Sequence, residues 1–303
     1  MKRIFVSALF CWLCFSPTLY AAEGKLKVVT STTLFADLVR QVGGDRVEVK
    51  PVASPKFNIH FIEPKPSDVR AVSKADLYVF AGLDLEAWSD PLVEAAGKTA
   101  LFRGGARSLD LSQGIGLLKA PLGTLSRSEG DMHLFGNPHY QLGPQNAAVM
   151  TGTILAKLKE IDPLGTAVYE ENQKRFLEKL DRKIPEWRAS CADCSGKEIY
   201  SYHDDIVYFT YFLGLRSELF LEPKPGVPPT PKHLELLEER ARSGTVMAIV
   251  MPTYYPRQAA ERVAKRIGVP VITIAQNPGE VAGTGDFFGF FDTNFRQISE
   301  MLK

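Results

Sequence analysis

The sequence predicts an α/β protein whose sheets are mostly parallel. Short runs rich in β-branched residues alternate with longer stretches in which apolar residues recur at helical spacing, which is typical of strand–helix–strand units. A second series of such units follows the first after a long helical stretch. With 303 residues and 45% hydrophobic content, the chain is long enough for one large or two medium domains with full cores.

The first series contains three predicted strands and one clear helix. The helix is expected at residues 34–42, and Gly43 and Gly44 end it. The strands are expected at residues 26–30, 47–52 and 77–81. Residues 105–132 are rich in Gly, Ser and Leu, so we expect a long surface loop there.

Two long helices are predicted between the series, at residues 145–161 and 166–188. Periodicity leaves two interpretations of the second helix open: an ordinary core helix, or a stiff connector between two lobes. The second series follows, with strands at 198–202, 248–251 and 271–274 and helices near 232–242 and 257–267.

The N-terminus has the order of a secretory signal peptide. Lys2 and Arg3 precede an apolar run at residues 4–15, and Ala21 and Ala22 mark the expected cleavage region, so residues 1–22 are the predicted signal peptide. The run is shorter than the roughly 20 residues that span a bilayer. A lipid anchor is not expected, because neither Cys11 nor Cys14 follows small residues.

Charge and cysteine content narrow the function classes. The chain carries 36 basic and 35 acidic residues, so no basic excess indicates nucleic-acid binding. Of the four cysteines, only Cys191 and Cys194 lie beyond the predicted signal peptide. In an oxidising compartment we expect them to form a local disulfide.

The histidines are the residues that point to chemistry. His60, His139 and His203 each lie near a predicted strand end or loop, where α/β sheets place their ligand sites. Three imidazoles meeting in a cleft would suit zinc, whereas manganese usually prefers more oxygen ligands. A surface or core role remains the alternative for each histidine taken alone. His233, at a predicted helix start, is expected at the surface.

Two other function classes compete with metal capture. An exported zinc-dependent hydrolase would also gather histidines, and it would need an acid or base such as Asp204, Asp205 or Glu280 beside an open metal position. An adhesin or binding module with a vestigial metal site is the other alternative.

Several motifs in order along the chain carry a family resemblance. They are Val28-Val29-Thr30-Ser31-Thr32, His60 with Glu63-Pro64-Lys65-Pro66, Gly82-Leu83-Asp84-Leu85-Glu86-Ala87-Trp88, Asn137-Pro138-His139-Tyr140, and Tyr202-His203-Asp204. Together the chain resembles the metal-binding solute-binding proteins of ABC transporters, the zinc and manganese receptors of bacterial periplasms. The resemblance covers essentially the whole chain after the signal peptide.

The resemblance implies two similar α/β lobes joined by a long rigid helix, with the metal site in the cleft between them. The domain boundaries it suggests are residues 23–143 for the N-terminal lobe, 144–190 for a helical region with the connecting helix, and 191–303 for the C-terminal lobe. His60 and His139 would be first-lobe ligands and His203 a second-lobe ligand. The cargo would be Zn²⁺, with Mn²⁺ less favoured, and the partner an ABC permease in the inner membrane. We expect a periplasmic monomer that is not an enzyme.

The chain departs from the family pattern at the fourth ligand. The carboxylate expected just after the last strand is absent, because Ile274 leads into Ala275-Gln276-Asn277-Pro278. Glu280, a few residues further on, is the predicted fourth ligand. Water and His133 are the alternatives, and Asp286 is expected to cap the final helix instead.

Overall fold

The computed structural model describes residues 24–119, 135–224, 227–242 and 244–302. The predicted signal peptide, Cys11, Cys14 and His133 lie outside the described residues. The strands are β1 (Leu26–Thr30), β2 (Val47–Pro51), β3 (Leu77–Phe80), β4 (Ser108–Asp110), β5 (Glu198–Ser201), β6 (Val246–Pro252) and β7 (Val271–Ile274). The α-helices are α1 (Thr33–Gly43), α2 (Pro66–Ser73), α3 (Ser89–Ala96), α4 (Ala147–Ile161), α5 (Thr166–Ser190), α6 (Val207–Leu213), α7 (Pro231–Ala241), α8 (Arg257–Ile267) and α9 (Phe287–Met301).

The first sheet has four parallel strands in the order β2-β1-β3-β4. Every residue of the central strand β3 is buried, as expected for a parallel strand covered on both faces. β4 lies inside the stretch predicted to be a loop, so that prediction is wrong at Ser108–Asp110. The strand has only three residues, and it forms by pairing with β3 rather than through any local apolar pattern.

The second sheet has three parallel strands in the order β5-β6-β7. Alternate residues of β6 face two different cores. Ala248 and Val250 belong to the main core, which continues into the first sheet, whereas Ile249 and Met251 pack in a smaller core under α7 and α8. This period of two is the geometry of a strand with both faces covered.

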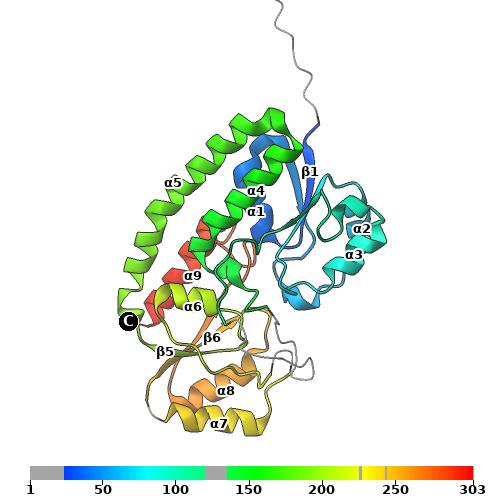
Figure 1. Ribbon diagram of the computed structural model, residues 1–303. Coiled ribbons are helices and arrows are strands. Elements are labelled where there is room, and N and C mark those ends of the chain that lie inside the picture. The colour runs from blue at the N-terminus through cyan, green and yellow to red at the C-terminus, as the bar shows by residue number, and fades with distance from the viewer. Residues whose placement is uncertain (1–23, 120–134, 225–226, 243, 303) are drawn as a thin grey trace, which may run out of the picture.

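The long helix α5 runs along one side of the molecule from the first sheet to the second (Figure 1). In the segment just before α5, Asp162 accepts two hydrogen bonds from Arg46, at 2.7 and 2.8 Å. Near the start of α5, the Asn172 amide donates to Val42 O of α1 at 3.0 Å. Near its end, Trp187 packs against the phenylalanines of α9 and donates from Nε1 to Asp292 at 2.7 Å. α5 therefore contacts α1 near its start and α9 near its end.

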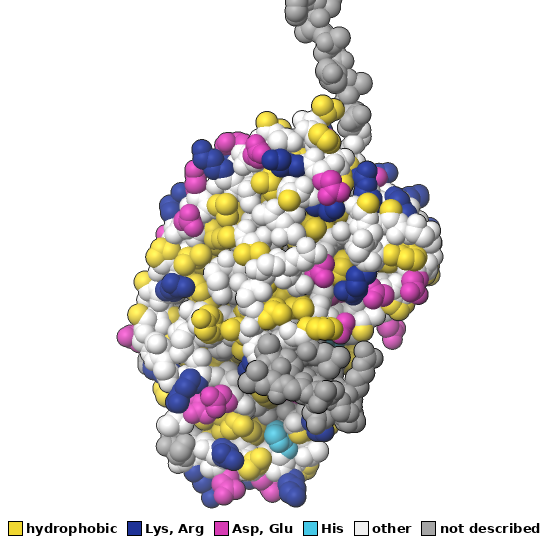
Figure 2. Space-filling view, viewed as in Figure 1, with side chains coloured by type: hydrophobic (Ala, Val, Ile, Leu, Met, Phe, Trp, Pro, Cys, Tyr) yellow, Lys and Arg dark blue, Asp and Glu magenta, His cyan; other side chains and the backbone are white. Residues whose placement is uncertain are grey.

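These features confirm the predicted fold class: an α/β protein with parallel sheets and one long helix between them. The proposed domain boundaries stay a prediction. α9 begins as expected, since the Asp286 carboxylate accepts a hydrogen bond from Gly289 N at 2.7 Å. Among the described residues, no helix is both long enough and apolar enough to cross a bilayer. On the face shown in Figure 2, basic and acidic side chains are interspersed.

Candidate metal site

The structure brings His60, His139 and His203 together, although they are widely separated in sequence. Their candidate ligand atoms all lie within 4.8 Å of one another. The ring centroids are 5.0 Å apart for His60 and His139, 5.7 Å for His60 and His203, and 5.8 Å for His139 and His203. All three pairs of rings meet edge to face, so their nitrogens converge on one small space.

The closest pair of nitrogens has a spacing that suits a metal. His60 Nε2 and His139 Nε2 are 3.2 Å apart. Two ligands of a tetrahedral zinc ion, each about 2.0–2.1 Å from the metal, lie roughly 3.3 Å from each other. The two imidazoles therefore need little movement to share one ion.

His60 is carried by a short 3-10 helix, Ile59–Phe61, in the loop after β2. The Asn58 side chain caps this turn, because Oδ1 accepts from His60 N at 3.0 Å. Trp88 Nε1 donates to Ile59 O at 2.7 Å and fixes the turn to the first lobe. The Asn58 amide also donates to the Tyr255 hydroxyl at 3.2 Å, so this loop contacts residues that follow β6.

His139 is held by an equivalent asparagine turn. Asn137 Oδ1 accepts from His139 N at 3.0 Å, and the Asn137 amide donates to Asp204 O at 2.6 Å. The Tyr208 hydroxyl donates to Asn137 O at 3.0 Å. His139 is buried, and its loop is tied directly to the loop that carries His203.

His203 lies two residues after the end of β5 and is buried. Its Nδ1 lies 2.9 Å from Glu222 Oε2. A carboxylate only accepts, so Nδ1 carries the proton, and the ring in its neutral form presents its Nε2 lone pair to the other histidines. A carboxylate on the second nitrogen is the usual support of a metal-ligating histidine, because it fixes the tautomer and makes the ligand more basic.

Burial and charge compete at the loop after β5. Burial lowers the pKa of His203, while the hydrogen bond to Glu222 and the charges of Asp205 and Glu222 raise it, and the net shift is upward. Burial also raises the pKa of the Asp205 carboxyl, to about 7. A cation beside the Asp205 carboxyl would favour its ionised form and lower its pKa.

Glu280, the predicted fourth ligand, is not part of the three-histidine group. Its Oε2 accepts from the backbone N–H groups of Gln276 and Asn277, at 2.7 and 3.2 Å, and its Oε1 accepts from the Thr253 hydroxyl. The carboxylate therefore holds the loop after β7 in shape. Its role as a ligand stays a prediction that would require these bonds to be exchanged.

Sequence reasoning missed Glu222 as the partner of His203. A signal was present, since Glu222-Pro223-Lys224-Pro225 repeats the Glu-Pro-Lys-Pro that follows His60. His233 lies apart from the group: its Nε2 is 2.9 Å from Phe220 O, and it is partly rather than fully exposed.

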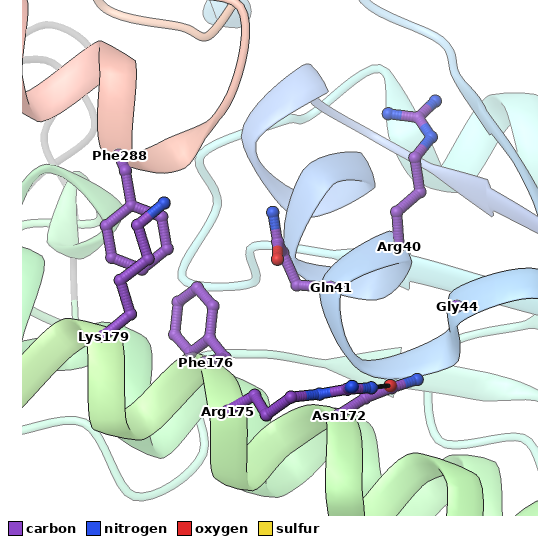
Figure 3. Close-up of a pocket in the computed structure, with 8 residues that line it drawn as sticks. All are labelled: Arg40, Gln41, Gly44, Asn172, Arg175, Phe176, Lys179 and Phe288. Atoms are coloured by element: carbon purple, nitrogen blue, oxygen red, sulfur yellow. Dashed lines mark hydrogen bonds between the residues drawn. The ribbon is translucent and has the colours of Figure 1, made fainter.

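A separate pocket of about 410 Å³ lies between α1, α5 and α9 (Figure 3). Three of its lining residues are cationic, and each already has a partner. Arg40 donates to Val49 O, Arg175 donates to the Asn172 side chain, and Lys179 Nζ lies 3.9 Å from the centroid of the Phe288 ring. The pocket contains no histidine and is distinct from the candidate metal site.

Comparison with known proteins shows the family of the chain. The family model described as "Zinc-uptake complex component A periplasmic" matches residues 28–301. A manganese ABC transporter substrate-binding lipoprotein, PsaA of Streptococcus mitis, is 26% identical over 309 residues, covering 99% of this chain and 96% of that protein. An iron ABC transporter substrate-binding lipoprotein, MtsA of Streptococcus pyogenes serotype M1, is 26% identical, covering 98% and 96%.

Solved structures share the fold at lower identity. The crystal structure of ZnuA has a TM-score of 0.77 at 22% identity and covers 92% of this chain and 100% of that chain. A cadmium-bound periplasmic metal-binding protein from Candidatus Liberibacter asiaticus has a TM-score of 0.76 at 18% identity, with the same coverage. A laminin-binding adhesin from Streptococcus agalactiae also has this fold, with a TM-score of 0.75 at 22% identity, covering 92% of this chain and 100% of that chain.

The extent of the family match bears on whether the chain is an enzyme. The family consists of extracytoplasmic substrate-binding components of ABC transporters, which bind a metal ion and work with a membrane permease and an ATPase. They are not enzymes, so the zinc-dependent hydrolase alternative is set aside. The chain belongs to the family of the periplasmic zinc-uptake complex component A, the metal-binding substrate-binding proteins of ABC transporters.

Proposed function

We propose that this chain captures zinc at His60, His139 and His203 in the periplasm and delivers it to an ABC permease in the inner membrane. The convergence of the three imidazoles, with ligand atoms all within 4.8 Å, is the observation that carries the proposal. Three nitrogen ligands favour zinc. Because relatives are named for manganese and for iron, the family alone does not select the metal, and we base the choice of zinc on the ligands of this chain.

The identity of the bound metal is tested first, by elemental analysis of the purified protein. Protein purified from the periplasm without added metal is analysed for zinc, manganese and iron, and we expect zinc near one ion per chain. A predominance of manganese or iron would contradict the choice of zinc and leave the transport function intact.

Binding is tested by titration of the metal-free protein with zinc against a chromophoric chelator. We expect a single stoichiometric endpoint, and excess zinc should raise the unfolding temperature because it binds only the folded chain. A titration with no endpoint would contradict metal capture and favour an adhesin or binding module with a vestigial site.

Release from the membrane is part of the proposal, although the streptococcal relatives are lipoproteins. Support comes from the sequence, where Cys11 follows Phe10 and Cys14 follows Leu13 rather than small residues. Osmotic shock should therefore free a monomeric protein of the mass expected after cleavage near Ala22. A protein that stays with the membrane fraction and carries fatty acid would contradict this.

A disulfide between Cys191 and Cys194 is proposed for the exported form. The two residues lie at the ends of a short turn in which Cys194 N donates to Cys191 O at 2.9 Å, and in the structure both are buried free thiols. Alkylation of the denatured protein without reductant should leave both sulfurs unmodified by mass. Two alkylated thiols would show that no disulfide forms.

A further inference from the structure

We propose that Asp205 supplies the carboxylate ligand of this metal site, oriented by Gln276. The inference rests on the proposed function, because it assumes a metal ion on the three histidines. The family resemblance places the carboxylate ligand just after β7, where Ala275-Gln276-Asn277 contains no acid. In this proposal the carboxylate ligand comes instead from the loop after β5.

Two buried acceptor atoms on the loop after β5 support the proposal. Within the described part of the chain, His203 Nε2 and Asp205 Oδ1 are both buried and have no hydrogen-bond partner. Buried polar atoms in folded proteins are paired in the great majority of cases, because leaving one unpaired is costly. Two such atoms, on residues only two positions apart in one loop, indicate that a ligand pairs with them.

The chemistry of the two atoms selects a cation. Because Glu222 accepts the Nδ1 proton of His203, the ring in its neutral form offers a lone pair at Nε2, and the Asp205 carboxylate offers one at Oδ1. His60 and His139 direct ring nitrogens into the same space. Nitrogen and carboxylate oxygen are the ligand types that zinc takes in proteins, and a single ion can join them all.

The carboxylate is oriented from the loop after β7. Gln276 Nε2 donates to Asp205 Oδ2 at 3.2 Å and leaves Oδ1 for another partner. The backbone N–H of Gln276 in turn donates to Glu280 Oε2 at 2.7 Å. Glu280 is therefore a positioning residue in this account, since it shapes the loop from which Gln276 reaches Asp205.

The neighbouring acid offers a contrast within the same loop. Asp204 Oδ1 lies 2.6 Å from Lys119 Nζ, and its side chain is 28% exposed. Asp205 is only 1% exposed and has no basic partner among the hydrogen bonds and ion pairs of the described residues. Asp205 lies outside the set of atoms that are all within 4.8 Å of one another, so metal binding has to draw the carboxylate and the imidazoles together.

The test compares zinc affinities, by chelator competition, of the parent protein with Asp205→Asn, Glu280→Gln and Asp204→Asn. Asparagine has the shape of aspartate and can still accept from Gln276, so the fold should persist, as circular dichroism checks. We expect Asp205→Asn to weaken zinc binding at least about tenfold. Asp204→Asn should stay within about threefold of the parent.

A second measurement separates ligation from a structural role. A buried carboxylate without a basic partner destabilises the metal-free fold, so Asp205→Asn should raise the unfolding temperature of metal-free protein while lowering zinc affinity. If Asp205 had only a structural role, Asp205→Asn would lower both the unfolding temperature and the zinc affinity. In Asp205→Cys, added Co²⁺ should produce a thiolate-to-metal charge-transfer band that the parent protein lacks.

The outcomes distinguish this inference from the function on which it rests. If the parent protein binds no zinc, the proposed function fails. If the parent binds zinc but Asp205→Asn stays within about threefold of it, or Asp205→Cys gives no charge-transfer band, a water molecule bridges the two acceptors and the inference is wrong. If only Glu280→Gln weakens binding, the fourth ligand is Glu280.

Discussion

Each histidine of the candidate site is held by the side chain of another residue. For His60 and His139 this residue is an asparagine two residues earlier, which caps the backbone turn. For His203 it is Glu222, whose carboxylate accepts the Nδ1 proton. These bonds hold the backbone turns of His60 and His139 and the ring of His203 before any metal arrives, which lowers the entropic cost of binding.

The three histidines should act as one unit. Replacing His60, His139 or His203 by Ala removes one ligand and should weaken zinc binding by at least about 100-fold, about 2.7 kcal/mol. Glu222→Gln should weaken it about 10- to 100-fold, because the ring loses its carboxylate partner. Chelator competition measures both effects. His233→Ala is the matched control, and parent-like affinity in His139→Ala would show that His139 is not a ligand.

Glu86 is a buried acid whose ionisation should make stability depend on pH. It is 1% exposed, accepts from Ala81 N at 2.6 Å, and burial raises its pKa to about 7. The unfolded chain releases this proton near about pH 4.3. Between these values only the folded state keeps the proton, so the free energy of unfolding falls as pH rises from about 4.3 to about 7.

Glu86→Gln should remove that part of the pH dependence, on the order of 3 kcal/mol between pH 4 and pH 8. The measurement is urea unfolding of metal-free parent and variant protein across this range. Glu48→Gln, at an exposed strand position, is the control. Parallel stability curves for parent and Glu86→Gln would mean that Glu86 does not titrate in this window.

Among the elements, α5 and α9 form the junction between the second sheet and the rest of the molecule. Trp187 of α5 is 3% exposed and lies with its ring 5.4 Å from Phe291 and 5.5 Å from Phe295, centroid to centroid. Lys183 and Trp187 both bond Asp292 Oδ1, at 3.0 and 2.7 Å. The two helices are thus joined by a large apolar contact, and the hydrogen bonds to Asp292 lie at its edge.

Trp187→Ala should lower the free energy of unfolding by about 3–5 kcal/mol, because it leaves a cavity among the phenylalanines of α9. Asp292→Asn keeps an acceptor oxygen at the partly exposed edge and should cost less than about 1 kcal/mol. Urea unfolding compares the two variants. If both variants lost the same free energy of unfolding, the hydrogen bonds to Asp292, and not the apolar contact, would stabilise the junction.

At the scale of the whole molecule, the two sheets meet through loops that carry the histidines and through α5. Contacts already join these loops without metal: Asn58 bonds Tyr255, Asn137 bonds Asp204 O, and Thr33 Oγ1 donates to Pro278 O at 2.7 Å. With α5 bonded at both ends, wide hinge opening would break many contacts at once. Capture should therefore depend on the ordering of local loops.

Hydrogen exchange should show this distribution directly. Zinc is expected to slow exchange in residues 57–62, 136–143, 202–206 and 275–280, while α5 exchanges equally slowly with and without metal. Mass spectrometry of peptides from the exchanged protein measures both. A zinc-dependent change along α5 itself would indicate movement of the connector and contradict capture by loop ordering.

The sequence by itself determined the alternation of strands and helices. Long helices such as α5 and α8 can be predicted because their apolar residues recur at helical spacing. It missed β4, whose three residues are a strand only through pairing with β3. It also singled out His60, His139 and His203 among the five histidines, because each lies near a predicted strand end or loop and within a motif that resembles the family's. Which atoms meet was decided by tertiary structure alone: Glu222 reaches His203 from 19 residues away, and Gln276 reaches Asp205 from 71 residues away. Such contacts depend on how separate loops are brought together by packing of distant elements, and that arrangement has no signature in local spacing.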